Sequence, residues 1–327
     1  GPEGRRLERS NPDIIEKFRD ITCINSRKYV SDDLHTSDIA TIAAETALED
    51  VDRETLDYII VGQNFGDVQA NNPQCEMVPS IAARVKHNLK IKNPYTVAFD
   101  VIFGCPGWLR GMIMTDYYIK SGDAKKVLVI GAETLSRISD PHDMDSMIYS
   151  DGAGAVLVEA TEQKAGILTH VSRSDTFSEA LLLWMDKSYN PDYRSKDRLF
   201  LKMHGHEIYK FAVKTVADVV RKALDKAGLG LADVKKVLIH QANQKMDEAI
   251  LKRLFKLYKM DSGPEHEHIM PMTISWLGNS SVATLPTLLD LLQRGQLDKH
   301  VLHSGDIAVF ASVGAGMNIN AMVYRMP

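Results

Sequence analysis

The chain has 327 residues, of which 44% are hydrophobic and 25% are charged, and its formal net charge is −4. This composition excludes an intrinsically disordered protein, and the mild acidity gives no general attraction to nucleic acid or to an anionic membrane. The sequence contains no apolar run of about 18 residues or more, so no membrane span is predicted. Three cysteines are too few for a disulfide framework, so we expect a cytoplasmic protein.

The first half of the chain alternates helical patterns with short apolar strands. A helix with small apolar residues on one face is predicted over 36–48. Strands are predicted at 56–64, at the start of 97–122, at 125–133 and at 154–160. The second of these strands turns sharply into a long amphipathic helix. Such alternation is typical of βα units packed around a buried sheet.

The second half repeats this order of elements. A longer helix over 207–227 leads to a strand at 234–243, and further strands are predicted at the start of 272–295, at 306–314 and at 317–325. Four matched elements in the same order predict an internal duplication.

We therefore expect two halves, residues 1–163 and residues 164–327, joined by a loop near 161–164. The region 177–202 fits neither half, because it mixes Leu, Trp, Tyr and Pro with several charges. We interpret this region as an insertion that caps a site, although a solvated surface excursion explains its composition equally well.

Three polar residues follow apolar segments at the sheet edge where α/β proteins bind ligands. They are Cys105, His240 and Asn279. Each has a purely structural explanation as well, since free cysteines are commonly small buried hydrophobes, lone histidines are commonly core residues, and asparagine is a good helix cap. A thiol, an imidazole and an amide at equivalent strand ends nevertheless favour a catalytic set.

The surroundings of Cys105 indicate a nucleophile rather than a packing residue. Gly104 precedes it and Pro106-Gly107 follows, so the backbone is expected to turn sharply there. The N-terminal dipole of the following helix would stabilise a thiolate, and the turn would direct a free backbone N–H at the atom that the sulfur attacks. Cys23 and Cys75 lack this setting.

Six short motifs follow one another along the chain. They are Phe103-Gly-Cys-Pro-Gly, Ser136-Arg-Ile-Ser-Asp-Pro-His-Asp, Ser150-Asp-Gly-Ala-Gly-Ala, His240-Gln-Ala-Asn, Gly278-Asn-Ser-Ser and Gly314-Ala-Gly. In this order they resemble the β-ketoacyl-acyl-carrier-protein synthase III family of the thiolase superfamily. The resemblance runs from about Asn11 to the C-terminus, and the family's usual N-terminal strand is not visible before Asn11. It implies a thiolase-like α/β fold with a duplicated five-layer αβαβα architecture.

By this resemblance, Cys105, His240 and Asn279 are the Cys-His-Asn triad of a condensing enzyme. Cys105 is acylated by a thioester, and His240 and Asn279 hold the thioester carbonyl of a malonyl-type donor. They stabilise the enolate formed on decarboxylation, which attacks the acyl-cysteine in a Claisen condensation of fatty acid or polyketide-type lipid biosynthesis. The backbone N–H groups of Cys105 and Ala315 would hold the oxyanion of the acyl step. No metal or other cofactor is implied.

The chain departs from the housekeeping enzymes of this family. Segment 18–24 lacks the Trp and Arg that clamp the adenine of coenzyme A, which favours carrier-protein-bound substrates over an acyl-CoA primer. Met77 and Val78 replace an aromatic residue that gates the acyl pocket, so a roomier pocket is expected. With Pro106 and Trp108, these features resemble the ketosynthase-cyclases that make dialkylresorcinols. Such enzymes join two acyl thioesters, one a β-ketoacyl unit, and close a cyclohexanedione ring.

A basic helix follows His240. It carries Lys245, Lys252, Arg253, Lys256 and Lys259. Charge runs of this kind are commonly solvated helix faces. In the family this region docks the acidic acyl carrier protein, so the resemblance implies docking here. It also implies a homodimer, and the apolar stretch 108–118 is compatible with burial at its interface.

Three alternatives to simple chain-building remain open. One is the ketosynthase-cyclase, and another is an acyltransferase that uses Cys105 without forming a carbon–carbon bond. The third is a non-catalytic partner of another ketosynthase, which the presence of all three catalytic residue types disfavours. Asn279 favours condensation, because acyl transfer needs a base more than an enolate clamp. The ligand-rich segment 265–268 follows a Gly-Pro turn and is interpreted as a solvated loop rather than a metal site.

Overall fold

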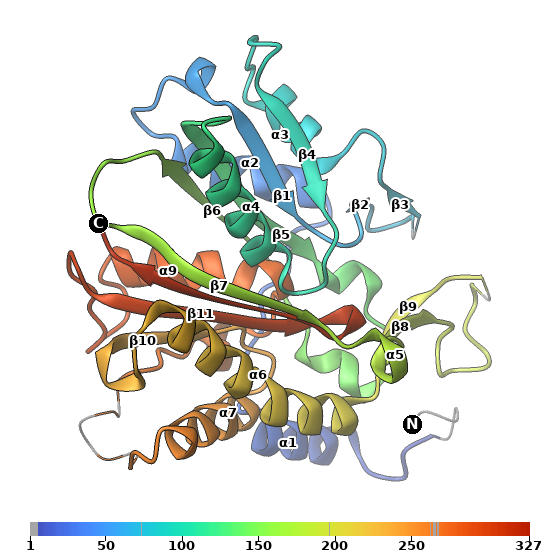
Figure 1. The fold of residues 1–327 in the computed structure, drawn as a ribbon. Helices are drawn as coiled ribbons and strands as arrows, with labels where there is room; N and C mark the ends of the chain where they lie inside the picture. The colour runs from blue at the N-terminus through green and yellow to red at the C-terminus, as the bar shows by residue number, and fades with distance from the viewer. Residues whose placement is uncertain (1–5, 73, 196, 262, 264–265, 267) are drawn as a thin grey trace.

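Two four-stranded sheets form the centre of the molecule (Figure 1). The computed structural model describes residues 6–72, 74–195, 197–261, 263, 266 and 268–327. The first sheet has the order β4-β1-β5-β6 and contains β1 (Tyr58–Gly62), β4 (Val97–Val101), β5 (Lys126–Thr134) and β6 (Asp151–Glu159). The second has the order β10-β11-β12-β7 and contains β7 (Gly166–Ser174), β10 (Val234–Ile239), β11 (Ile307–Gly314) and β12 (Asn318–Arg325).

Helices alternate with the two sheets to give five layers. In the first sheet β1 is parallel to β4 and β5, and in the second β10 is parallel to β11, while the remaining pairs are antiparallel. One outer layer consists of α2 (Thr36–Ala47) and α3 (Ile81–Asn88). The middle layer consists of α4 (Gly107–Ser121) and α9 (Thr284–Gln293), and the other outer layer of α6 (Gly205–Ala227) and α7 (Gln244–Leu257). The predicted αβαβα architecture is therefore confirmed.

Shorter elements surround these layers. The helix α1 (Asn11–Thr22) packs against α7, and the hairpin β8 (Leu183–Asp186)–β9 (Phe200–Met203) projects from one side of the molecule (Figure 1). The remaining elements are β2 (Asp67–Val68), β3 (Cys75–Glu76), α5 (Thr176–Glu179) and α8 (Ile274–Leu277). Among the described residues, no helix has the length and apolar character needed to cross a membrane.

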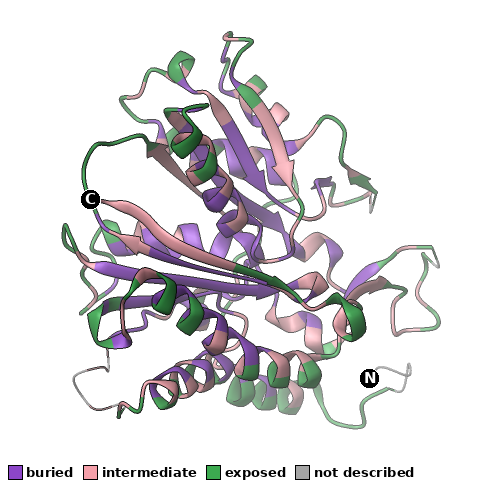
Figure 2. Cartoon of the chain, in the orientation of Figure 1, coloured by how far each residue is buried: buried purple, intermediate pink, exposed green. Residues whose placement is uncertain are grey.

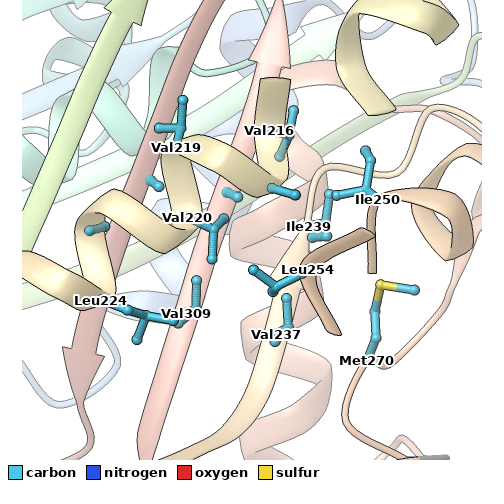
Figure 3. Packing of buried hydrophobic residues seen from close by; sticks show 14 of the residues in the cluster. Val216, Val219, Val220, Leu224, Val237, Ile239, Ile250, Leu254, Met270 and Val309 are labelled. Carbon is cyan, nitrogen blue, oxygen red and sulfur yellow. The ribbon is translucent and has the colours of Figure 1, made fainter. Parts of the chain in front are cut away.

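Apolar side chains fill the spaces between the layers, and the inner strands β1, β5, β11 and β12 are mostly buried (Figure 2). Between the sheets, Trp108 of α4 packs with Ile60 of the first sheet and Phe310 of the second. On the outer side of the second sheet, α6 and α7 contribute Val216, Val220 and Leu254 to a cluster that covers β10 and β11 (Figure 3). Burial of each such side chain stabilises the folded protein by about 1.5–3 kcal/mol. This packing holds the sheets rigidly, and with them the sheet edges that carry polar residues.

The two sheets differ where the sequence predicted equivalence. The strand expected at the start of 272–295 is wrong, because this segment forms the short helix α8 and then an extended turn. The second sheet therefore lacks a counterpart of β4, and the unpredicted strand β7 occupies its far edge. All strands of the first sheet end by Glu159, and all strands of the second begin at or after Gly166.

Candidate active site

Cys105, His240 and Asn279 line one cavity of about 390 Å³. It lies where the turn after β4, the end of β10 and the segment before α9 meet, so residues from both sheets surround it. Most of its wall is apolar, and large side chains from several elements contribute to it. They include Phe65, Phe103, Leu135, Ile148, Tyr149, Trp184, Met185, Leu201 and Met203. The structure thus brings together the three residues that the sequence singled out.

The nucleophile turn and a late turn of the chain interlock at the cavity floor. Gly104 has a φ of +64°, and a Cβ at this position would lie 2.6 Å from the backbone nitrogen of Ala315. A Cβ on Gly314 would lie 2.4 Å from the backbone nitrogen of Cys105. Only glycine permits this approach, so the two backbone N–H groups assigned to the oxyanion lie in adjoining turns that line the same cavity.

The Cys105 thiol is held in its protonated form. Cys105 lines the cavity, and desolvation by the surrounding protein raises its pKa to about 11. A hydrogen bond from Oγ of Ser281 to Sγ, 3.4 Å long, opposes the rise because it favours the thiolate. The resting thiol differs from the thiolate expected at a helix N-terminus, because desolvation outweighs the stabilising contacts.

His240 is a neutral imidazole at the end of β10. Its backbone N–H donates to the carbonyl of Ala311 over 2.8 Å, and only 2% of the residue is exposed. Burial lowers the pKa of His240 to about 4, and a hydrogen bond with the backbone of Ser281 only partly opposes this shift. At neutral pH the ring therefore carries one N–H donor and one acceptor nitrogen.

Asn279 combines the two tasks that the sequence left open. Its Oδ1 accepts a hydrogen bond from the backbone N–H of Ser281 over 2.9 Å, as a capping side chain does. This bond fixes the plane of the carboxamide and leaves the NH₂ group to donate on the cavity side. Backbone bonds to Ile148 and Ser150, of 3.0 and 2.8 Å, hold the residue itself in place.

Two residues that the sequence analysis missed support the nucleophile turn. Oδ1 of Asn64 accepts a hydrogen bond from the backbone N–H of Gly104 over 2.9 Å, and its Nδ2 donates to Glu133 over 2.7 Å. Glu133 is fully buried on β5, and desolvation raises its pKa to about 8. The only signal in the sequence is a polar residue at the carboxyl end of each strand, which is too general to identify a pair.

Gln241, next to His240, organises the segment that leads to Asn279. Its Nε2 donates to the carbonyl of Pro271 over 2.9 Å, and its Oε1 accepts from the backbone N–H groups of Thr273 and Ile274 over 2.8 and 2.9 Å. These side-chain bonds take the place of a strand partner. They explain why the apolar segment after Met272 is helical rather than extended.

The insertion caps the cavity, as one of the two interpretations of 177–202 predicted. Leu183, Trp184 and Met185 of β8 line the cavity, as does Leu201 of β9. The side chain of Lys202 is fully buried and ion-pairs with Asp140 and Asp143, whose carboxylates belong to the Ser136-Arg-Ile-Ser-Asp-Pro-His-Asp motif. Its ammonium also lies 3.6 Å from the centre of the Tyr189 ring. This buried ion pair, which no sequence pattern indicated, anchors the hairpin.

Met77 and Val78 do not reach the cavity within one chain. Val78 is 88% exposed and Met77 is at the surface beside β3, and neither lines the cavity. The structure of one chain therefore does not place them in the acyl pocket.

The basic residues of α7 fall into two groups. Lys252 and Lys256 are exposed. Arg253 instead pairs with Asp218 of α6 at 3.2 Å, and Lys245 donates a hydrogen bond to the backbone carbonyl of Asp20. Lys245 is exposed too, but its ammonium is engaged by this bond, so Lys252 and Lys256 are the better candidates for docking.

Comparisons with known proteins agree with this fold. Models of 3-oxoacyl-acyl-carrier-protein (ACP) synthase III match residues 99–176 and, for its C-terminal part, residues 224–326. A β-ketoacyl-acyl-carrier-protein synthase III of Ruegeria pomeroyi is 33% identical over 95% of this chain and 90% of its own length. One of Staphylococcus haemolyticus is 31% identical over 93% and 88%. The crystal structure of the Aquifex aeolicus 3-oxoacyl-acyl-carrier-protein synthase III, 29% identical, superposes with a TM-score of 0.80 over 97% of this chain and 95% of that one.

The five-layer fold with a cysteine turn between its sheets is that of the thiolase-like enzymes. Within that class, the chain belongs to the β-ketoacyl-acyl-carrier-protein synthase III family.

Proposed function

We propose that this protein is a condensing enzyme that joins an acyl group on Cys105 to a malonyl- or β-ketoacyl-thioester by Claisen condensation. The observation that carries the proposal is the meeting of Cys105, His240 and Asn279 in one apolar cavity. The cavity offers a nucleophile, two uncharged hydrogen-bond donors and space for an alkyl chain, which are the parts that carbon–carbon bond formation between thioesters requires.

In the first step the sulfur of Cys105 attacks the carbonyl of an acyl thioester. The new carbon–sulfur bond forms as the thiol loses its proton, and the carrier's thiol leaves carrying a proton. The oxyanion of the tetrahedral intermediate is stabilised by the backbone N–H groups of Cys105 and Ala315. The interlocked glycines support this role, because they set these two turns against each other.

In the second step the donor thioester places its carbonyl oxygen between His240 and Asn279. A malonyl unit releases CO₂, and the electron pair of the broken bond becomes an enolate. A neutral imidazole N–H and the carboxamide NH₂ stabilise its charge without a metal. The enolate carbon then attacks the acyl-cysteine carbonyl, the carbon–sulfur bond to Cys105 breaks, and the thiolate regains a proton. The lowered pKa of His240 supports this role, because the ring stays uncharged at neutral pH.

The substrates we propose are acyl chains delivered as thioesters by an acyl carrier protein. Lys252 and Lys256 present positive charge on α7, close along the chain to His240, and an acidic carrier would be attracted to them. The segment 18–24 contains Arg19 but no Trp that could stack on an adenine, which also supports a carrier protein over coenzyme A.

We further propose a homodimer formed through the edge strand β4. Among the described strands β4 pairs with β1 alone, so its other edge can bind a second chain. Exposed apolar side chains lie on and beside it, including Tyr95, Val97 and Ile102, and such a group at a strand edge is typical of an interface. In such a dimer, the exposed Met77 and Val78 would be covered and could complete the acyl pocket of the partner.

The proposed halves, 1–163 and 164–327, would then divide the chemistry between them. The first half supplies the nucleophile, and the second supplies the imidazole and the carboxamide. The separation of the strands into two sheets on either side of residues 160–165 supports this division.

Mass spectrometry of the intact protein tests the proposal. After incubation with a panel of acyl- and β-ketoacyl-carrier proteins, the protein should gain the mass of one acyl group, and Cys105→Ala should gain none. His240→Ala and Asn279→Ala should still be acylated but should form no condensed product. Absence of any acyl adduct on the parent protein would refute the proposal. An ester or amide product with an alcohol or amine acceptor would identify an acyltransferase instead.

A further inference from the structure

The two backbone N–H groups assigned to the oxyanion are both available as donors. Cys105 and Ala315 line the same cavity, and neither donates its backbone N–H to another of the residues that the structure describes. Two such donors stabilise an oxyanion only when their directions are fixed before the charge develops. The contacts that fix the two peptides therefore decide how well the site can stabilise the oxyanion.

The side chain of Asn64 holds the first donor through Gly104. Its Oδ1 accepts the backbone N–H of Gly104 over 2.9 Å, and the carbonyl of Gly104 accepts the N–H of Gly107 over 3.0 Å. The peptide planes on both sides of the Gly104 Cα are thus held by hydrogen bonds. The N–H of Cys105 belongs to the second of these planes, so these bonds also set its direction.

Glu133 holds the carboxamide of Asn64 in turn. Nδ2 of Asn64 donates to Oε2 of Glu133 over 2.7 Å, and the backbone N–H of Asn64 lies 3.4 Å from Oε1. Glu133 is fully buried on β5, which gives the amide a rigid anchor. Because the NH₂ end of the amide is bound to a carboxyl group, only its oxygen can face the N–H of Gly104.

The turn of the second donor has a separate support. Nδ2 of Asn318 donates to the carbonyl of Ala315 over 2.8 Å, and its Oδ1 accepts from the hydroxyl of Ser174 over 2.5 Å. Asn64 follows β1 of the first sheet, whereas Asn318 begins β12 of the second. A change at Asn64 should therefore disturb the Cys105 donor and leave the Ala315 donor in place.

We propose that Asn64, anchored by Glu133, is a positioning residue that directs the N–H of Cys105 at the oxyanion formed when a thioester acylates the sulfur. This inference rests on the proposed function and adds a residue to the machinery of the same site. Both ends of the Asn64 amide are engaged by the protein, so Asn64 acts through the backbone of the nucleophile turn. It makes and breaks no covalent bond.

The test compares two reactions of the same sulfur. Acylation by a carrier-protein thioester passes through a tetrahedral oxyanion, whereas alkylation by iodoacetamide displaces iodide and forms none. Asn64→Ala should slow single-turnover acylation of Cys105 at least tenfold, because loss of one oxyanion donor costs about 10²–10³ in rate and a misdirected N–H keeps part of its effect. Alkylation should keep the parent rate. A residue that only supported the fold would not separate the two rates.

Asn64→Asp tests the anchor and keeps the shape of the side chain, so the question stays open to experiment even if Asn64→Ala does not fold. One oxygen of the new carboxylate can accept the N–H of Gly104, and the other meets Glu133. The two carboxyl groups tolerate each other only while they share a proton. Burial raises the pKa of Glu133 to about 8, so this proton is present at neutral pH. The ratio of acylation to alkylation rates should match the parent ratio at neutral pH and fall below it at higher pH.

Asn88→Ala is the matched control. Asn88 is also a half-buried asparagine with a side-chain hydrogen bond, from its Nδ2 to Oγ1 of Thr41 over 3.1 Å. It lies at the end of α3 in the outer layer and does not line the cavity. This variant should leave both rates unchanged.

Three outcomes would overturn the inference. The first is an unchanged acylation rate in Asn64→Ala. The second is an equal loss of acylation and alkylation, which would show that Asn64 affects the sulfur rather than the oxyanion. The third is a rate ratio in Asn64→Asp that stays equal to the parent ratio at every pH, which would remove Glu133 as the anchor. Failure of any thioester to acylate Cys105 of the parent protein would instead refute the proposed function together with this inference.

Discussion

Oγ of Ser281 lies 3.4 Å from Sγ of Cys105, although the two residues are 176 positions apart in the chain. Ser281 also donates its backbone N–H to Asn279 and forms a backbone hydrogen bond with the ring of His240. One residue outside the triad thus contacts all three of its members. It fixes the relative position of the sulfur, the imidazole and the carboxamide.

Replacement of Ser281 by alanine should slow the reaction of the nucleophile. The hydroxyl lowers the pKa of Cys105 by stabilising the thiolate, so its loss should raise that pKa further. We expect alkylation of Cys105 by iodoacetamide at neutral pH to slow about tenfold, because the loss of a hydrogen bond to a charged group destabilises that group by about this factor. Ser280→Ala is the control, because the Ser280 hydroxyl faces Thr284 at 3.5 Å. An unchanged alkylation rate in Ser281→Ala would show that the contact does not stabilise the thiolate.

Glu133 should make the protein less stable as the pH rises toward 8. Its pKa is raised by burial from 4.5 to about 8 in the folded state, so the folded protein binds this proton more tightly than the unfolded chain. The stabilisation is complete below pH 4.5 and is lost as the pH rises through about 8. Glu133→Gln should flatten this part of the stability profile measured by urea unfolding, and the exposed Glu162→Gln should not. An unaltered slope in Glu133→Gln would assign the pH dependence to other groups.

The buried ammonium of Lys202 should be essential for stability. Lys202→Met leaves Asp140 and Asp143 without their cation, and an uncompensated buried charge costs about 3–5 kcal/mol. Urea unfolding of this variant can be compared with Lys210→Met. Lys210 pairs with Glu207 at 3.0 Å on the exposed face of α6. The free energy of unfolding of Lys210→Met should therefore fall by at most about 1 kcal/mol. Equal losses in the two variants would mean that the hairpin does not depend on its buried ion pair.

Carrier-protein docking should depend on the exposed lysines of α7. The double variant Lys252→Glu/Lys256→Glu should weaken binding of the acidic carrier, most strongly at low salt, because screening reduces the interaction of exposed charges. Lys164→Glu makes a similar charge change in the loop between β6 and β7 and should have little effect. Titration calorimetry at two salt concentrations measures the difference, and unchanged affinity at low salt would contradict docking at α7.

Arg253 should behave differently from these lysines. Its partner Asp218 would face a like charge in Arg253→Glu, so this variant should lose stability as well as any binding.

The family resemblance predicted the five layers, and the three residues of the cavity were singled out from the sequence, although the strand expected before Asn279 is the helix α8. Cys105 lies in a turn between two glycines and a proline, and His240 follows a strand of β-branched residues, so local pattern alone placed them at strand ends. Periodicity likewise predicted α2 and α6 to within two residues of their observed bounds.

The remaining features depend on contacts between distant parts of the chain. Gln241 determines the conformation of the segment around Thr273 through side-chain bonds, which no periodicity records. The partners of Lys202 lie about 60 positions earlier in the chain. From the sequence pattern, a lysine between apolar residues of a strand is predicted to be exposed to solvent. Such residues can be recognised only when the folded structure shows what surrounds them.

The desolvation that keeps the Cys105 thiol protonated has a second effect. A thioester formed on that sulfur would sit among apolar side chains, where few water molecules can approach its carbonyl. Spontaneous hydrolysis of the loaded protein should then be slow compared with its half-life in bulk solvent. The acylated protein would then persist until a second carrier protein arrives. No conformational change would be needed to coordinate the arrival of the two carriers.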